Sequence, residues 1–179
     1  HADQIQGFFN VPVDHLFGSA IFAPYIESLK LDDLTVSAPD MGGSKRANAY
    51  SQHLQAEMVL CYKLRKKPNT VEKMSIIGEV EGRNVVIIDD MIDTAGTIVL
   101  AANMMKERGA KSIRAFATHP ILSGNAVERI NNSAIEELVV TDSVPLTKTS
   151  DKIKVLSIAQ IFARTILAVT NNSSISTNF

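Results

Sequence analysis

Several features that mark particular protein classes are scarce or absent in this sequence. Its 179 residues include no tryptophan and a single cysteine, Cys61, so no disulfide can form within the chain. This excludes a disulfide-stabilised secreted scaffold and favours a reducing cytoplasm. No apolar run reaches the length needed to cross a membrane, and no signal peptide is evident.

Neither sign of charge is in excess. Lysine and arginine total 18 and aspartate and glutamate total 19, which gives a net charge of −1. This balance does not favour binding to nucleic acid or to a membrane surface, so neither partner is expected. The hydrophobic content of 45% suffices for a substantial core, and we expect residues 1–179 to form a single domain.

Strand-like and helix-like segments alternate along the chain. Strands are expected at residues 34–38, 57–62, 84–88, 112–118, 137–141 and 154–157. Helices are expected at residues 43–55, 98–108, 125–132 and 158–169. The alternation predicts an α/β fold in which a parallel sheet carries helices on both faces. Residues 74–80 are expected to form an antiparallel flap strand instead.

The most informative segment is 85–97. Four β-branched residues, 85–88, predict a strand buried on both faces, and Asp89 and Asp90 follow it directly. Ionised carboxylates are seldom buried without a partner, so these two should point into the crevice at the carboxyl end of the sheet. Two adjacent carboxylates can accept hydrogen bonds from two adjacent sugar hydroxyls.

A turn of small and hydroxyl-bearing residues follows these acids and precedes the helical pattern. Its members are Asp93, Thr94, Ala95, Gly96 and Thr97. Free backbone amides and the helix dipole make such a turn an anion site. The alternative is a simple helix cap by Asp93 or Thr94 with no ligand.

This order of residues resembles the phosphoribosyl-pyrophosphate (PRPP) binding motif of type I phosphoribosyltransferases and PRPP synthetases. The resemblance implies a type I phosphoribosyltransferase-like fold, with Asp89 and Asp90 on the ribose 2- and 3-hydroxyls and the turn on the 5-phosphate. Ala95 stands where many members have glycine. Further segments resemble the synthetases in particular, namely 1–14, 37–47, 117–126 and 174–179. The chain is therefore expected to be the C-terminal half of a longer two-domain synthetase.

A second anion site is expected after the first strand, at Asp40, Met41, Gly42 and Gly43. A glycine pair lets backbone approach an anion closely, although in isolation it could equally be a plain connection. The resemblance implies that these four residues form the pyrophosphate loop and that Asp40 helps to hold Mg²⁺, an ion that prefers oxygen ligands. It also places His1 beside the ATP polyphosphate and its magnesium.

A basic segment, 62–69, lies between a strand and the expected flap. Most such runs are solvated loops. The resemblance implies instead the flexible catalytic loop of the synthetases, with Lys63 and Arg65 as catalytic cations. Two mobile cations closing over a polyphosphate would offset the charge that builds on the transferred group.

The resemblance also implies a regulatory site for phosphate or ADP between subunits. Matching positions are Gln6, Asp14, Ser174, Ser176 and Phe179. An ordinary exposed tail is an equally good reading of the last residues. A homo-oligomer of dimers building a hexamer is expected on the same ground.

Together these features predict Mg²⁺-dependent transfer of diphosphate from ATP to ribose 5-phosphate, which gives PRPP and AMP. This chain would supply the ribose-5-phosphate and pyrophosphate sites and could be inactive alone. Two alternatives stay open. One is a non-catalytic regulatory subunit associated with the synthetase, and the other is a phosphoribosyltransferase that consumes PRPP.

Overall fold

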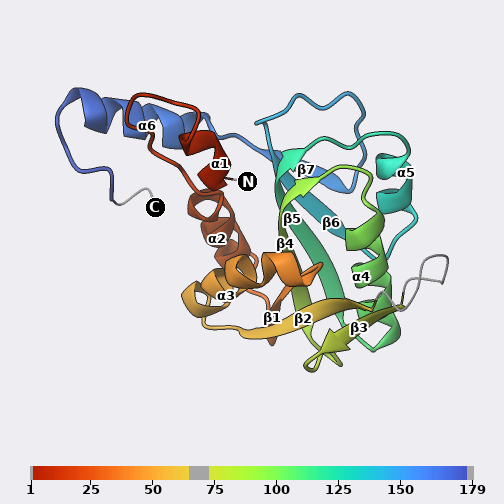
Figure 1. Cartoon of the computed structure of the whole chain (residues 1–179). Helices are drawn as coiled ribbons and strands as arrows, with labels where there is room; N and C mark the ends of the chain where they lie inside the picture. The colour runs from red at the N-terminus through yellow and green to blue at the C-terminus, as the bar shows by residue number, and fades with distance from the viewer. Residues whose placement is uncertain (1, 65–72, 177–179) are drawn as a thin grey trace.

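A single seven-stranded sheet forms the centre of the molecule in the computed structural model, which describes residues 2–64 and 73–176 (Figure 1). Its spatial order is β3-β2-β1-β4-β5-β6-β7. The strands are β1 (Leu34–Ala38), β2 (Glu57–Leu64), β3 (Lys73–Ile77), β4 (Asn84–Ile92), β5 (Ser112–Pro120), β6 (Glu137–Thr141) and β7 (Ile153–Leu156). Every neighbouring pair is parallel except β2–β3, which is antiparallel.

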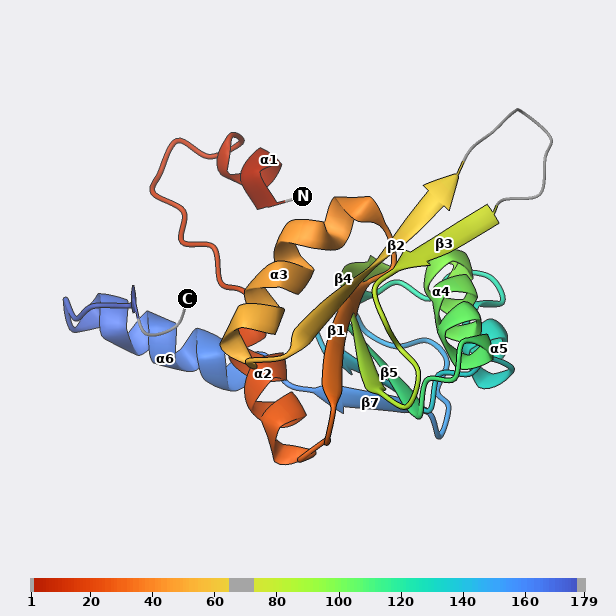
Figure 2. The same ribbon diagram turned by 90° about the horizontal axis from the view of Figure 1, so that it is seen from below.

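Helices cover both faces of this sheet, as the sequence predicts (Figure 2). They are α1 (Ala2–Gln6), α2 (Ser19–Ser28), the short 3-10 helix η1 (Met41–Gly43), α3 (Ser44–His53), α4 (Gly96–Glu107), α5 (Ala126–Asn131) and α6 (Ala159–Thr170). Helices α2 and α3 pack on one face and α4 and α5 on the other. None of the helices in the described part of the chain has the length and apolarity needed to span a bilayer.

The central strand β4 divides the core by its two-residue period. Val85 and Ile87 pack with the helices on one face, whereas Val86 and Ile88 pack with those on the other. All four are fully buried, which is the environment that a β-branched run predicts. A strand anchored in this way on both faces is a rigid base for the polar residues at its end.

The expected elements are present, with some different boundaries. The strands at 34–38 and 137–141 are confirmed, and β3 is the expected antiparallel flap strand. Strand β3 ends at Ile77 because Gly78 follows with φ +111°. Strand β4 continues beyond residue 88 to Ile92 because β5 runs alongside it and pairs Ile92 with Pro120.

Helix α2 was not predicted from the sequence, and its internal proline argues locally against a helix. Pro24 lies inside this helix, where it removes one backbone donor and normally interrupts helical structure. Burial of Phe22, Ala23 and Ile26 against the sheet offsets that cost. The short helix α1 was also not expected. Helix α6 extends away from the sheet on the side opposite α4 and α5 (Figures 1 and 2).

Candidate functional site

The two acids of β4 lie at the carboxyl end of the sheet and share one guanidinium. Arg46 Nη1 lies 3.1 Å from Asp89 Oδ1, and Arg46 Nη2 lies 3.2 Å from Asp90 Oδ2. All three side chains are partly exposed, at 33% for the arginine and 24% and 30% for the acids. The carboxylates are therefore reachable from solvent but already bound to a cation from α3.

The pKa values of Asp89 and Asp90 are shifted in opposite directions. Burial raises the pKa of Asp89 to about 7, and neighbouring Asp90 adds to the rise. Burial also acts on Asp90, but a hydrogen bond with Asp89 and the charge of Arg46 outweigh it and lower the pKa of Asp90. The backbone amide of Asp90 donates to Asp89 Oδ1 at 2.9 Å. Of the two neighbouring acids, Asp90 therefore ionises first and Asp89 holds its proton to a higher pH.

The turn after these acids opens α4 in the arrangement that suits an anion. Ala95 adopts a left-handed conformation with φ 61° and immediately precedes the helix, which begins at Gly96. Asp93, Thr94 and Gly96 are exposed around it. The first amides of a helix have no partner within it, and the helix dipole is positive there, so this end of α4 can receive a phosphate.

Two residues that the sequence analysis missed hold this turn in place. The hydroxyl of Ser123 donates to Asp93 Oδ1, and the Ser123 amide donates to the Asp93 carbonyl oxygen at 3.1 Å. Arg129 Nη1, on α5, donates to the Thr94 carbonyl oxygen at 2.9 Å. Both come from the segment after β5, which lies beside β4 in the sheet.

The glycine loop after β1 is tightly formed. Asp40 Oδ1 accepts a hydrogen bond from the Gly43 amide at 3.2 Å and thereby caps η1. A Cβ at position 43 would lie 3.0 Å from the Ala38 Cβ and 3.6 Å from Arg46 Nη1. Gly43 therefore packs closely against β1, where a side chain would require its neighbour to move by a few tenths of an ångström, and the loop lies beside the Arg46 guanidinium.

One cavity of about 170 Å³ joins these parts. Asp40 from the glycine loop and Asp89 from β4 line it together with the whole turn from Asp93 to Thr97. Residues far apart in the sequence thus meet at one edge of the sheet, where open α/β sheets bind ligands. Asp89 and the turn, which were predicted for ribose phosphate, thus share this cavity with Asp40 of the predicted pyrophosphate loop. Asp90, Met41, Gly42 and Gly43 are not among its lining residues.

The remaining predicted site residues do not meet there within the described residues. The Lys63 backbone lies in β2, opposite Met74 of β3, in the hairpin at the edge of the sheet. Gln6, Ser174 and Ser176 are exposed near the two ends of the chain, and Asp14 is exposed in the segment before α2. In both views α1 and α6 lie on the other side of the molecule from α4 (Figures 1 and 2). His1, Arg65 and Phe179 lie outside the described residues.

A ready-made metal centre is not found where the structure is described, since no group of three or more His, Cys, Asp or Glu side chains could hold an ion. Asp40 and Asp89 nevertheless line the same cavity, and their oxygens are the donor type that Mg²⁺ prefers. Since Mg²⁺ usually keeps several waters and takes substrate oxygens as ligands, a single protein carboxylate such as Asp40 can suffice.

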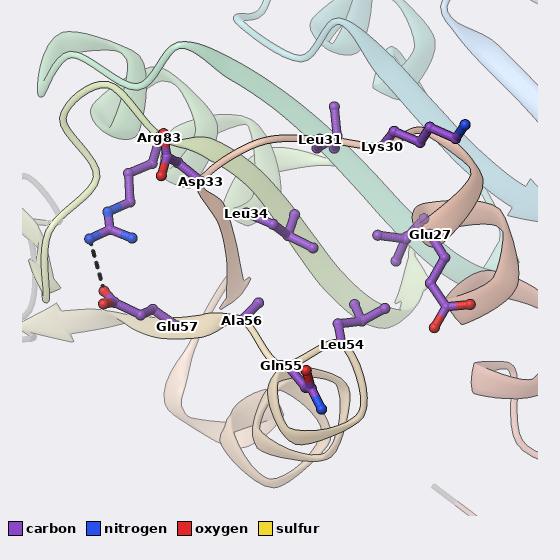
Figure 3. A pocket seen from close by; sticks show the side chains of 11 residues that line it. Glu27, Lys30, Leu31, Asp33, Leu34, Leu54, Gln55, Ala56, Glu57 and Arg83 are labelled. Carbon is purple, nitrogen blue, oxygen red and sulfur yellow. Dashed lines mark ion pairs between the residues drawn. The ribbon is translucent and has the colours of Figure 1, made fainter.

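A larger cavity, of about 470 Å³, lies at the opposite ends of the strands from the site described above (Figure 3). It sits at the amino ends of β1, β2 and β4, where Arg83 Nη2 pairs with Glu57 Oε2 at 3.1 Å. Apolar side chains such as Leu34 and Leu54 make up much of the rest. Its position at the amino ends argues against it as the site, despite its size.

Arg46, Ser123 and Arg129 were not among the residues predicted for the site. Arg46 and Asp89 are separated by 43 positions, and Arg129 and Thr94 by 35. No local sequence pattern predicts contacts between residues this far apart. The one available signal was that α3 and the segment after β5 both begin at the carboxyl edge of the sheet.

A family model described as "Phosphoribosyl synthetase-associated domain" matches residues 32–179. Ribose-phosphate pyrophosphokinase of Porphyromonas gingivalis is 49% identical over 178 residues, which cover 99% of this chain and 57% of that protein. The Bacillus subtilis ribose-phosphate pyrophosphokinase is 48% identical over 98% of this chain and 56% of its own length. The chain thus spans somewhat more than half the length of these relatives.

Two solved structures resemble this chain in fold. The crystal structure of phosphoribosylpyrophosphate synthetase from Mycobacterium smegmatis matches with a TM-score of 0.86 and 36% identity, over 96% of this chain and 56% of that one. The adenine phosphoribosyltransferase (APRTase) of Giardia lamblia matches with a TM-score of 0.53 at 16% identity, over 67% of this chain and 74% of that one, which shows a common fold alone. The expected α/β fold of the type I phosphoribosyltransferases is confirmed.

Proposed function

This chain belongs to the phosphoribosyl synthetase family, as a homologue of ribose-phosphate pyrophosphokinases, and on that premise we propose that it binds ribose 5-phosphate and pyrophosphate for an enzyme that makes PRPP. The reaction would be the transfer of diphosphate from ATP to ribose 5-phosphate, with AMP as the second product. The observation that carries the proposal is the cavity that Asp40, Asp89 and the turn from Asp93 to Thr97 line together.

The ribose would bind at the end of β4. Ribose hydroxyls donate hydrogen bonds, and the paired carboxylates of Asp89 and Asp90 are acceptors that remain partly exposed. The 5-phosphate would bind at the turn before α4, where the backbone amides and the helix dipole favour an anion. Ser123 and Arg129 would hold that turn in its binding geometry.

Diphosphate transfer itself requires positioning and charge stabilisation more than covalent chemistry from the protein. The anomeric hydroxyl oxygen of the ribose forms a bond to the β-phosphorus of ATP. The bond from that phosphorus to the oxygen it shares with the α-phosphorus breaks, and AMP leaves with this oxygen. The hydroxyl proton is lost to solvent. No residue of this chain needs to act as a nucleophile.

Mg²⁺ would be held by Asp40, with His1 as the second ligand that the family resemblance implies. The ion would neutralise charge on the polyphosphate. Lys63 and Arg65 would add further positive charge over the transferred group. Binding of pyrophosphate by the loop at 40–43 is supported by its capped, glycine-dependent geometry beside Arg46.

The wider assembly is part of the same proposal. We infer that the chain is the C-terminal half of a two-domain synthetase of the cytoplasm, that the assembly is a homo-oligomer of dimers building a hexamer, and that phosphate or ADP regulates it at a site with Gln6, Asp14, Ser174, Ser176 and Phe179. Support comes from the family and from the length of the relatives, of which this chain covers 56% to 58% in the most similar ones.

Ligand binding by this chain is the first test. Isothermal titration with ribose 5-phosphate should give saturable binding, and Asp90→Asn should weaken it by about 10-fold because one charged acceptor is lost. Arg83→Gln is the control, since it breaks an ion pair at the opposite edge of the sheet and should leave the affinity unchanged. Equal effects of the two variants would contradict the assigned ribose site.

Activity is the second test. AMP formation from ATP and ribose 5-phosphate should be measured for this chain, and for this chain fused behind the part of the Bacillus subtilis relative that precedes the matched region. We expect activity in the fusion. Binding without activity in either protein would favour the non-catalytic associated subunit, and release of pyrophosphate from PRPP with a purine base would favour a phosphoribosyltransferase.

A further inference from the structure

Arg46 binds both of the acids to which the proposed function assigns the ribose hydroxyls. Its two terminal nitrogens lie 3.1 and 3.2 Å from the two carboxylates of β4, one nitrogen to each acid. A guanidinium presents its donors in a fixed planar fork, so one arginine can bind both acids at once. A ribose that donates to the same oxygens must compete with this arginine.

The same guanidinium also faces the glycine loop. Its Nη1 lies 3.6 Å from where a Cβ at Gly43 would be, and Gly43 is the residue whose amide Asp40 caps. Arg46 itself is the third residue of α3, three positions after Gly43. A small rotation of a side chain that is one-third exposed would therefore carry its charge from the acids toward an anion held by the loop.

We propose that Arg46 is a latch between the two subsites: it closes the ribose site in the free protein, and ribose displaces it toward the pyrophosphate subsite. This proposal rests on the proposed function. Arg46 then acts as a positioning residue that couples the two ligands, because ribose phosphate can bind the acids only when the arginine has moved to where it stabilises pyrophosphate.

If Arg46 is a latch, its removal should change the affinities for ribose 5-phosphate and for pyrophosphate in opposite directions. A purely structural arginine, one that only holds α3 against β4, does not predict this. In Arg46→Gln, ribose 5-phosphate no longer competes with a cation and should bind about 5-fold more tightly. Pyrophosphate loses a cation and should bind about 5-fold more weakly. If Arg46 is purely structural, Arg46→Gln should weaken the binding of both ligands, because the loop and the strand end would both become less ordered.

The test is calorimetric titration of each ligand separately, at pH 8, into this chain and three variants. Arg46→Gln should show the two opposite shifts, and Arg46→Lys should lie between it and the unmodified chain because an ammonium is not a planar fork. Lys45→Gln is the matched control, since it removes a neighbouring exposed charge of α3 that is not paired with the acids. It should shift both affinities by less than about 2-fold.

A measurement without ligand separates the latch from the function on which it rests. A double-mutant cycle of Arg46→Gln and Asp90→Asn on thermal unfolding should show non-additive effects if the ion pair forms in the free protein. Additive effects, or shifts of the same sign for both ligands in Arg46→Gln, would overturn the latch. Clear non-additivity together with no ribose 5-phosphate binding in any variant would overturn the proposed function instead.

Discussion

Arg129 Nη1 donates to the Thr94 carbonyl oxygen at 2.9 Å and so joins α5 to the turn before α4. Both groups are exposed, so this bond orders the turn and adds little to global stability. Arg129→Gln should therefore weaken ribose 5-phosphate binding by about 3- to 10-fold and change the free energy of unfolding by less than about 0.5 kcal/mol. Titration calorimetry and urea unfolding measure the two effects.

Lys106→Gln is the matched control for that prediction. Lys106 Nζ also donates to a backbone carbonyl oxygen at 2.9 Å, that of Lys111, but at the far end of α4. If it weakens ribose 5-phosphate binding as much as Arg129→Gln does, the effect comes from lost positive charge and the contact with Thr94 has no special role.

Gly43 can be tested by adding one methyl group. A Cβ here would lie 3.0 Å from the Ala38 Cβ, and Ala38 is fully buried, so one of the two backbones must shift. Gly43→Ala should lower the free energy of unfolding by about 1–3 kcal/mol and abolish detectable pyrophosphate binding. Gly7→Ala meets nothing closer than 3.5 Å and should be neutral in both measurements.

Ala95 tests the strain in the phosphate turn. Its φ of 61° is left-handed, a conformation that costs a residue with a side chain about 1–2 kcal/mol and glycine very little. Ala95→Gly should therefore raise the free energy of unfolding, by about 0.5–1 kcal/mol after the entropy that glycine gains in the unfolded chain. Ribose 5-phosphate affinity should not change, since the turn keeps its backbone path. A loss of stability would show that the Ala95 methyl packing outweighs the strain.

The physical basis of the sequence predictions explains where they succeeded. The run at 85–88 predicted a strand buried on both faces, and its period-two division between the two core clusters fulfils that prediction. The acids and the turn follow directly in the chain, so their meeting at one edge needed only a parallel sheet. The glycine loop came to the same edge because β1 is parallel to β4 and beside it.

What the sequence could not supply were contacts set by packing rather than by local order. Arg46 contacts Asp89 only because α3 packs beside the carboxyl end of β4. Arg129 contacts Thr94 only because α5 packs beside the turn before α4. Helix α2 was missed because Pro24 argues locally against a helix, and only burial of Phe22 and Ile26 reverses that preference. Tertiary packing, which brings distant segments together, decided each of these cases.

The protonation of Asp89 gives a last test, through the pH dependence of stability. Burial raises the pKa of Asp89 from 3.8 to about 7, so the folded chain holds a proton between about pH 4 and 7 that the unfolded chain has released. Stability contributed by this group is therefore greatest at low pH in that window and is lost as the pH rises through 7. Asp89→Asn cannot ionise and escapes this loss.

The measurement is urea unfolding of the unmodified chain and of Asp89→Asn at pH 5 and pH 8. Relative to the unmodified chain, Asp89→Asn should gain at least about 1 kcal/mol between the two pH values, since one pKa unit corresponds to about 1.4 kcal/mol. Asp142→Asn is the control: hydrogen bonds from the Ser157 side chain and the Ile158 amide lower the pKa of Asp142, so it stays ionised throughout. Its stability difference should be the same at both pH values, whereas a constant difference for Asp89→Asn would mean that Arg46 keeps Asp89 ionised at pH 5.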